Sequence, residues 1–267
     1  MRSQAILSFL TIASFFAILH PAVAQDAPPS GLPDVPKPLI VAPEDGATLR
    51  NTPRNLLKDQ MAIWTSPLHL RPSNAAGPVV LVAATVIAMT TDHQAMSSSR
   101  LQDASLNSHA NTASNGLLGG LVVIPAALYG VGALQHRAQP QETGILAGEA
   151  MVDSLAVNEV MKLVAQRERP TVDNARGRFF QSGVGTGSSF PSNHAILAWS
   201  SAAVVASEYP GFLSDVAIYG LATGVSVTRV VARQHFPSDV LVGSAVGWMI
   251  GRYVFRHHQR SHDMTHF

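Results

Sequence analysis

The hydrophobic positions of this chain fall into six long, weakly charged runs that polar segments separate. The runs are rich in Ala, Val and Leu and cover residues 78–90, 116–135, 144–168, 193–207, 212–229 and 238–255. Most are longer than a typical strand, and no alternating pattern or hairpin turn competes with them. The pattern therefore predicts an all-α protein, a six-helix bundle with an extended N-terminal arm.

Residues 1–24 have the pattern of a cleaved secretory signal peptide. Arg2 supplies a positive charge, a short apolar core follows, and the small residues Ala22-Val23-Ala24 form a cleavage site. An uncleaved anchor helix is the alternative, but the core is short for a membrane span. The pattern predicts export to the cell envelope, with the functional site on the periplasmic or extracytoplasmic side.

Residues 25–74 form a Pro-rich arm that ends in a short amphipathic segment, from Asn55 to Leu70. As a helix, this segment carries Leu56, Leu57, Met61 and Trp64 on one side. We expect that side to pack on the bundle, with contact to a lipid surface as the alternative.

The main domain covers residues 75–255, and residues 256–267 form a polar, His-rich tail. Two polar segments interrupt the domain. Residues 92–115 are too polar to be core. Residues 171–190 are a Gly/Ser-rich loop placed to act as a lid or selectivity wall, with plain disorder as the alternative. The tail histidines could bind a metal, but a solvated tail without fixed geometry explains them more simply: His257, His258, His262 and His266.

The composition excludes several classes of function. The chain has no cysteine, which rules out disulfides, thiolate catalysis and cysteine metal sites. Without residues 1–24 it keeps 243 residues (267 minus 24), and its 17 basic residues (18 minus Arg2) balance 17 acidic ones. Such a balance gives no overall field that would favour nucleic acid as a partner.

The first of three chemistry-bearing stretches contains Lys162 and Arg169. They lie seven residues apart in a helix-like run that Pro170 would end, so the spacing predicts two cations on one helix face. Arg167 points about 140° away from Lys162 on the same helix. We therefore expect Arg167 to be a surface charge and not a ligand.

The second stretch begins at Pro191, which suits the first turn of a helix. The backbone N–H groups that follow would lie at the positive helix end and form an anion site: Ser192, Asn193 and His194.

The third stretch adds Arg229, a bidentate donor, and places His235 four residues before Asp239. A carboxylate bound to one imidazole N–H would fix the tautomer and leave the other nitrogen to attack.

Together the stretches resemble the motifs of the type 2 phosphatidic acid phosphatase (PAP2) and vanadium haloperoxidase superfamily. That family's pattern is a Lys, six residues and Arg-Pro, then Pro-Ser-Gly-His, then Ser-Arg, five residues, His, three residues and Asp. The first stretch fits fully. The others depart from the pattern at Asn193, where the family usually has Gly, and at Thr228, where it usually has Ser.

The resemblance implies a phosphatase on a helical bundle that needs neither metal nor cofactor and acts on a phosphorylated small molecule or lipid. His235 would be the nucleophile that forms a phosphohistidine, Asp239 would orient it, and His194 would protonate the leaving oxygen. Five residues would hold the phosphoryl oxygens: Lys162, Arg169, Ser192, Asn193 and Arg229. The Asn193 side chain could narrow access to the phosphate or supply another donor.

Two other functions remain open at this point. A pocket for a phosphoryl transition state can also hold vanadate against His235, so a vanadate-dependent haloperoxidase is one alternative. A phosphate-binding envelope protein without turnover is the other, although both histidines and Asp239 are present.

The sequence signals on membrane contact conflict. Residues 116–134 carry no charge and are long enough to cross a bilayer, and residues 75–91 are nearly as apolar. Glu149 and Asp153, however, fall on the side opposite Lys162 and would meet lipid in an immersed bundle, so we expect them to form a polar surface. The balance slightly favours a soluble or surface-bound protein whose apolar runs are buried against other helices.

Overall fold

The computed structural model describes residues 47–69, 71 and 75–258, and every regular element in this part is helical. The α-helices are α2 (Thr52–Thr65), α3 (Ala76–Met96), α4 (Ala104–Leu134), α5 (Ala138–Ala165), α6 (Asn193–Glu208), α7 (Phe212–Val231) and α8 (Pro237–His258). Single 3-10 turns lie at Ser66–His69, Ser99–Gln102, Asp173–Ala175 and Gly185–Gly187. The all-α prediction is confirmed. The six runs correspond to α3 through α8, and α2 makes a seventh helix in the described chain.

The predicted signal peptide and most of the Pro-rich arm, residues 1–46, lie outside the described residues.

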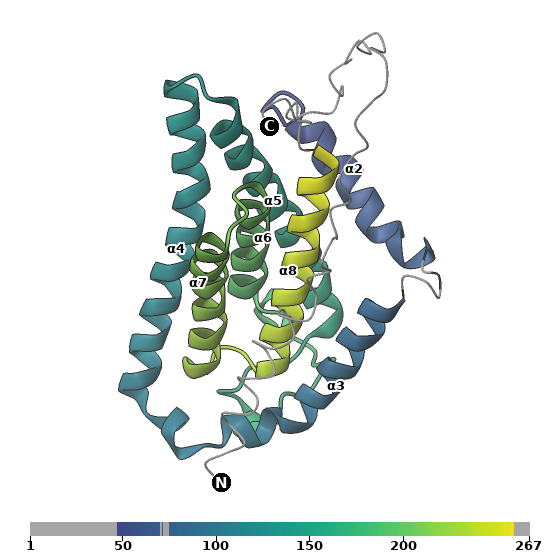
Figure 1. Ribbon diagram of the computed structural model, residues 1–267. Coiled ribbons are helices and arrows are strands. Elements are labelled where there is room, and N and C mark those ends of the chain that lie inside the picture. The colour runs from purple at the N-terminus through teal and green to yellow at the C-terminus, as the bar shows by residue number, and fades with distance from the viewer. Residues whose placement is uncertain (1–46, 70, 72–74, 259–267) are drawn as a thin grey trace, which may run out of the picture.

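Helix α6 lies in the middle of the bundle (Figure 1) and packs on α4, α5, α7 and α8. Its sequence is almost free of charge and rich in Ala, Ser and Val, and most of its residues are buried. A helix that is apolar on all sides is stable only where other helices surround it. The core on both sides of α6 therefore fixes the directions of α5, α7 and α8.

The contact between α6 and α8 depends on three glycines spaced four residues apart on α8. A Cβ atom at Gly243 would lie 2.9 Å from the carbonyl oxygen of Ser192, and at Gly247 and Gly251 it would collide with the backbone of α6. Only glycine permits the two backbones to approach this closely. This stripe brings the N-terminal ends of α6 and α8 side by side.

Helix α2 packs on α5 and α8 with its polar side, which is the reverse of our expectation. Asn55 and Asp59 are buried, whereas Leu57, Met61 and Trp64 are 70%, 71% and 46% exposed. The physical reason is that α2 covers buried polar residues of α5 and α8. Buried polar groups require hydrogen-bond partners, and the polar side of α2 provides them.

Two of those covered residues are Glu149 and Asp153, which are buried and do not form the expected polar surface. The Asn55 side chain donates to both carboxylate oxygens of Glu149, at 3.3 and 3.4 Å. The Gln60 amide donates to Asp153 Oδ1 at 2.8 Å. Our prediction was wrong because helical periodicity places these acids opposite Lys162 but does not show that α2 covers them.

His258 also meets α2, so the expectation of a solvated tail is wrong at this position. It is the last residue of α8, its side chain is buried, and its Nε2 donates to Asp59 Oδ1 at 2.8 Å. His257 is exposed, and His262 and His266 lie outside the described residues. Within residues 47–69, 71 and 75–258, no three His, Cys, Asp or Glu side chains are arranged to hold a metal ion.

The polar segment 92–115 is mostly helical, because α3 extends to Met96 and α4 begins at Ala104. Asp103 caps α4 by accepting from the backbone N–H groups of Ser105 and Leu106 at 2.8 and 3.1 Å. Against expectation, part of this segment is core: Asp92, Met96, Ala110 and Ser114 are buried.

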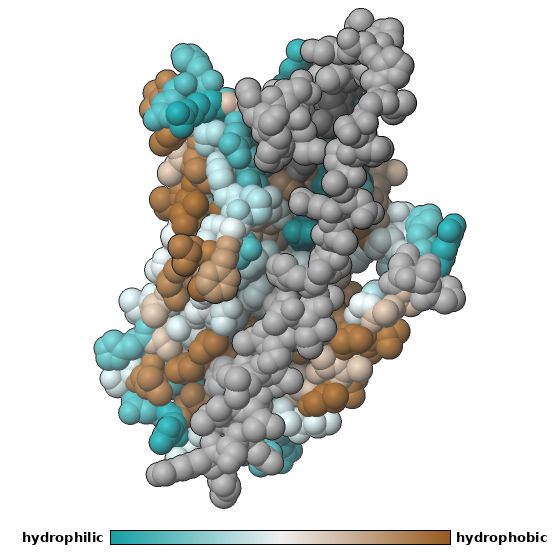
Figure 2. Space-filling view, in the orientation of Figure 1, coloured by the Kyte–Doolittle hydropathy of each residue, from teal (hydrophilic) through white to brown (hydrophobic). Residues whose placement is uncertain are grey.

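Helices α3 and α4 turn large apolar surfaces outward, which contradicts the expectation that their runs are buried. Both are long and apolar enough to cross a membrane, and only 11% and 17% of their most apolar stretches are buried. In the space-filling view, apolar surface lies over α4 on one side and over α3 on the other (Figure 2). The exposed side chains include Val79, Val82, Val86 and Ile87 of α3 and Val122, Val123, Val131 and Leu134 of α4.

We expect Asp153→Asn to stabilise the protein at pH 8 and to leave its stability unchanged at pH 4. Burial raises the pKa of Asp153 from 3.8 to about 7, although the Gln60 hydrogen bond opposes the shift. The folded state then binds this proton more tightly than the unfolded state. The free energy of folding that the protonated Asp153 contributes is therefore fully present below about pH 4 and is lost as the pH rises to about 7. Thermal unfolding at both pH values measures it.

An Asn amide imitates the neutral carboxyl group, so the variant should unfold several °C higher at pH 8, since about 1 kcal/mol shifts Tm by 2–4 °C at this size. Glu208→Gln at the end of α6 makes the same change of charge away from α2 and is the control, which should leave the melting temperature at pH 8 unchanged. An Asp153→Asn effect of equal size at both pH values would contradict the expectation.

Candidate active site

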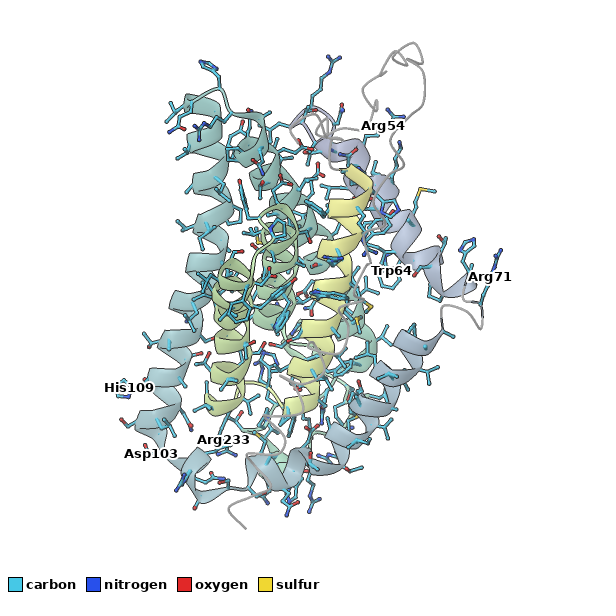
Figure 3. All side chains as sticks on the ribbon, in the orientation of Figure 1. Arg54, Trp64, Arg71, Asp103, His109 and Arg233 are labelled. Atoms are coloured by element: carbon cyan, nitrogen blue, oxygen red, sulfur yellow. The ribbon has the colours of Figure 1, made fainter. Side chains whose placement is uncertain are left out.

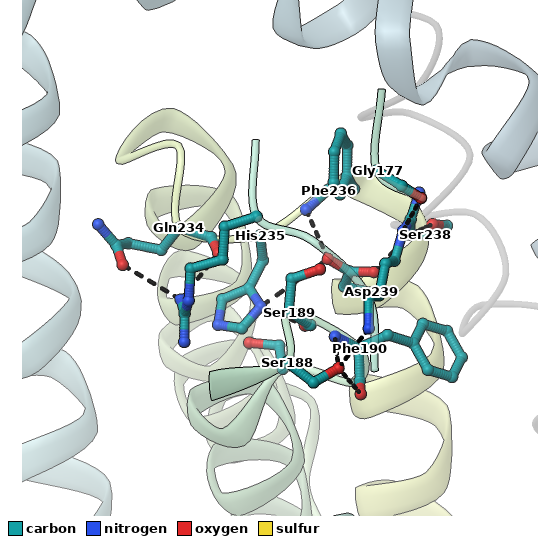
Figure 4. Close-up of polar contacts among 12 residues, drawn as sticks. Gly177, Ser188, Ser189, Phe190, Gln234, His235, Phe236, Ser238 and Asp239 are labelled. Atoms are coloured by element: carbon teal, nitrogen blue, oxygen red, sulfur yellow. Dashed lines mark hydrogen bonds and ion pairs between the residues drawn. The ribbon is translucent and has the colours of Figure 1, made fainter. Parts of the chain in front are cut away.

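The three predicted stretches meet where α5 ends and α6 and α8 begin (Figures 1 and 4). Lys162 lies in the last turn of α5, His194 in the first turn of α6, and His235 two residues before α8. Figure 3 shows Arg233, from the loop before α8, at the same end of the bundle as Asp103 of α4. The site therefore lies where helix ends converge.

Helix α5 ends earlier than the sequence predicts. Gln166 adopts a left-handed conformation with φ of 42° directly after Ala165, so Arg167 and Arg169 lie in a loop. Lys162 and Arg169 consequently do not share a helix face. They still lie close enough for the charge of Arg169 to lower the pKa of Lys162.

The predicted phosphate-binding cations donate only to neutral oxygens. Lys162 Nζ donates to the Ser188 carbonyl at 2.5 Å. Arg169 donates to the carbonyl of Gly187 at 3.1 Å and to both oxygens of Gln234 at 3.0 and 3.2 Å (Figure 4). Arg229 Nη1 donates to Asn111 Oδ1 at 2.8 Å. In the described part of the chain, these three cations form no ion pair with a carboxylate: Lys162, Arg169 and Arg229.

Burial and mutual repulsion oppose the positive charges at this site. Burial, followed by the charge of Arg169, lowers the pKa of Lys162 to about 8 and the pKa of Arg229 to about 10. Burial also lowers the pKa of Arg169. Since Lys162 is only 2% exposed, water does little to offset this repulsion. A bound anion would relieve it.

His235 is held by a backbone carbonyl instead of by Asp239. Its Nδ1 donates to the Ser189 carbonyl at 2.6 Å, whereas Asp239 Oδ2 lies 3.9 Å from Nδ1 (Figure 4). A proton on Nδ1 leaves the lone pair on Nε2, which is the state that a nucleophile requires. Burial, and then the charges of Arg229 and Arg169, lowers the pKa of His235 well below its usual range. This shift favours the neutral imidazole.

Asp239 does not orient His235 directly because other groups occupy its carboxylate. Oδ1 accepts from Arg167 Nη1 at 2.5 Å, and Oδ2 accepts from the backbone N–H of Phe236 at 2.8 Å. The prediction of a surface position for Arg167 is wrong, since this side chain is 3% exposed and also pairs with Asp92 at 2.7 Å. The error follows from the early end of α5, because a helical projection does not apply beyond Ala165.

His194 contacts α4, a helix in which the sequence indicated no site residue. Its Nε2 donates to Asn115 Oδ1 at 2.9 Å, which leaves Nδ1 for proton transfer. Asn111, one helical turn earlier on α4, accepts from Arg229. The four-residue spacing of the two asparagines is the signal that could have found them. Burial, followed by Arg229 and Arg169, lowers the pKa of His194 to about 4.

Ser192 and Asn193 begin α6 but make other contacts than expected. Ser192 is the N-cap, and its N–H donates to the Asp239 carbonyl at 3.2 Å, so that N–H does not face an anion. The Asn193 side chain accepts from Asn158 and donates to Glu159 at 3.3 Å, both on α5. The contribution of Asn193 to an anion site is therefore its backbone N–H, at the positive end of α6.

The loop of residues 171–190 forms one wall of the site. Gly187, Ser188 and Ser189 supply the carbonyl oxygens that accept from Arg169, Lys162 and His235, in that order. Both Lys162 and His235 are 2% exposed beneath these contacts. The loop therefore lies against the predicted nucleophile, and its role as a lid or selectivity wall stays a prediction.

Comparison with protein-family models matches residues 143–263 to the PAP2 superfamily. No curated protein and no solved structure matches the chain.

We expect an anion at this site to bind together with protons. Sulfate is suited to the test because it has no proton to exchange between pH 5 and 8. It would offset Arg169 and Arg229, whose charges help to lower the pKa of His194 to about 4. The pKa of His194 then rises on binding, so the complex takes up protons from solution. Calorimetric titration in buffers of different ionisation enthalpy at pH 5.5 measures the number taken up.

The matched variant His194→Gln keeps a side chain that can bind Asn115 but cannot titrate, and it should take up fewer protons. Binding without proton uptake in the unmodified protein, or with proton release, would contradict this account of the site.

Proposed function

Since residues 143–263 belong to the PAP2 superfamily, we propose that this protein is a metal-independent phosphatase that hydrolyses a phosphomonoester or pyrophosphate through a phosphohistidine on His235. The family match supports a phosphatase- or haloperoxidase-type enzyme that acts on phosphorylated substrates. The substrate is a lipid phosphate or a small phosphorylated metabolite.

One observation carries this proposal: the buried Lys162 and Arg229 and the half-buried Arg169 converge beside His235 with only neutral oxygens as hydrogen-bond partners. Burying a charge without a counter-charge is unfavourable, so such a site is built for an anion that arrives with the substrate. A phosphoryl group presents several negative oxygens to the three cations. They supply the positive charge that a metal ion would otherwise provide.

The reaction follows from the two histidines. His235 Nε2 attacks phosphorus, the bond to the leaving oxygen breaks, and that oxygen takes a proton from His194. Water then attacks the phosphohistidine, the phosphorus–nitrogen bond breaks, and His194 accepts the water proton. Before the first step His194 must be protonated, and the negative charge of the bound phosphoryl group favours this by raising its pKa from about 4.

We further propose that the protein is exported and contacts the membrane through α3 and α4. Many of their large apolar side chains are exposed, and a surface of this kind is typical of contact with a membrane or a partner. The acids that argued against lipid contact, Glu149 and Asp153, are buried against α2. A soluble protein was expected to bury the apolar runs of α3 and α4 and to expose these two acids. In this structure the apolar side chains are exposed and the acids are buried.

His235→Ala should abolish turnover and acid-labile phosphoryl labelling, because no other group in this mechanism replaces the Nε2 lone pair. His194→Ala should slow substrates with poor leaving groups most, since a stable leaving anion needs no proton. The measurements are a metal-free screen across lipid phosphates, prenyl pyrophosphates and soluble phosphomonoesters, and rapid-quench labelling.

His257→Ala, an exposed change at the far end of α8, is the control and should behave like the unmodified protein. Normal turnover in His235→Ala would overturn the phosphohistidine mechanism. Halide oxidation with added vanadate and peroxide, in the absence of phosphatase activity, would favour the haloperoxidase.

Washing the membrane fraction with alkaline carbonate should leave the chain in the pellet, because apolar contact with lipid survives the loss of electrostatic contacts. Replacing Val82 and Val86 on the exposed face of α3 by Asn should weaken retention without changing the melting temperature greatly. Complete release of the unmodified protein would contradict the proposed membrane contact.

A further inference from the structure

The most extensively bonded side chain beside the site is Arg167, which the phosphatase mechanism does not use. Its Nε donates to the Gly177 carbonyl at 3.1 Å, Nη1 to Ser238 Oγ at 2.7 Å and Asp239 Oδ1 at 2.5 Å, and Nη2 to Asp92 Oδ2 at 2.7 Å. The rings of Phe179 and Phe236 lie 4.7 and 4.1 Å from its guanidinium carbon. Contacts on every edge and two aromatic contacts hold this guanidinium in one position.

Asp92, near the end of α3, connects Arg167 to the start of α8. Besides Arg167, its carboxylate accepts from the backbone N–H of Ser238 at 3.1 Å and from the Ser238 hydroxyl at 2.5 Å. The first N–H groups of a helix have no partner within the helix, and a carboxylate there also benefits from the helix dipole. Asp92, on α3, thus caps the N-terminus of α8 at Ser238, which lies three residues after His235.

The side chain of Arg167 fixes the backbone on one side of His235. It binds Asp239 Oδ1, and Asp239 Oδ2 accepts from the N–H of Phe236, the next residue after His235. These bonds form a continuous path from Asp92 through Arg167 and Asp239 to the backbone that carries the imidazole.

The backbone of Arg167 fixes the opposite side of His235. Its N–H donates to Ser188 Oγ at 2.9 Å, and its carbonyl accepts from the N–H of Ser189 at 2.9 Å. Ser189 in turn provides the carbonyl that binds His235 Nδ1. One residue therefore holds both the chain that carries His235 and the carbonyl that sets its tautomer.

The hydrogen-bond partners of Arg167 differ in charge from those of the anion-site cations. Arg167 forms ion pairs with two carboxylates, Asp92 and Asp239, whereas Lys162 donates to a neutral carbonyl. A substrate phosphoryl group is thus attracted to the site cations, and Arg167 stays bound to its acids. This separation favours a role in geometry over a role in binding.

We infer that Arg167 and Asp92 are positioning residues of the phosphatase reaction, which aim His235 Nε2 at phosphorus. The inference rests on the proposed function, because it assigns these residues to the step in which His235 attacks. Misplacing an attacking atom by about 1 Å can lower a rate about 100-fold. The effect should therefore fall on kcat and on phosphohistidine formation, and not on KM.

The test uses Asp92→Asn, Arg167→Lys and Ser238→Ala in the full chain. Asp92→Asn keeps the shape and one acceptor but removes the charge, and Arg167→Lys keeps the charge but removes the planar fork. Both should lower kcat about 10- to 100-fold with KM within about threefold, and phosphohistidine formation should slow in parallel. Ser238→Ala removes one hydroxyl from the same network. It takes the place of Asp92→Asn or Arg167→Lys in the test if either of those variants does not fold.

The control is Arg178→Lys, an exposed arginine of the same loop that pairs with Glu168 and Asp173. It should keep the kcat of the unmodified protein. A folded Asp92→Asn or Arg167→Lys variant with unchanged kcat would overturn the inference, and so would a loss seen only in KM.

A binding measurement separates this inference from the proposed function. Orthovanadate forms a bond to the nucleophilic nitrogen, whereas sulfate only fills the anion site. Asp92→Asn should weaken orthovanadate binding about tenfold and leave sulfate binding unchanged, because only the first requires His235 in line. Absence of turnover in the unmodified protein would overturn the proposed function, whereas equal effects on both anions would overturn the positioning role.

Discussion

The close contact between α6 and α8 is the constraint on which the candidate site depends. Gly243, Gly247 and Gly251 let the two backbones approach to a distance that a Cβ atom would prevent. Two helix N-termini then lie side by side, and the N–H of Ser192 donates to the carbonyl of Asp239. One motif, Pro191 to His194, spans this N-cap, and the loop before α8 carries His235. The glycine contact between α6 and α8 thus holds the two motifs together.

The distribution of charge around this contact divides into two parts. On one side, Arg167 is matched by Asp92 and Asp239 in a buried network with saturated hydrogen bonding. On the other, Lys162, Arg169 and Arg229 donate to carbonyl and amide oxygens, which stabilise a cation without cancelling its charge. The first arrangement suits a rigid support, and the second suits an exchangeable anion. The same residue type, arginine, serves both because its partners differ.

The sequence predicted the helices well because they are encoded locally. Helix length and the apolar runs can be read within short windows of sequence. The errors involve contacts between distant segments. Glu149 is buried because α2 covers it, and Asn115 reaches His194 from a helix that begins 89 residues earlier (193 minus 104).

A second kind of error came from a local detail that periodicity does not show. The left-handed conformation of Gln166 ends α5 before Arg167, so a projection made for a continuous helix placed this arginine outside. The outward apolar side of α2 was missed for a related reason. An amphipathic pattern shows that a helix has two sides, and the partners of Asn55 and Asp59 decide which side is buried.

The match to the family model begins at residue 143, but the candidate site also includes residues before that position. Asp92, Asn111 and Asn115 all precede that boundary, and each bonds to a residue within the matched segment. A fragment cut at the homology boundary would retain every motif residue and still lack the cap of α8 and the partners of Arg229 and His194. The structural unit that builds the candidate site is therefore larger than the segment that the family model matches, and α3 and α4 contribute to this site as well as to the outer surface.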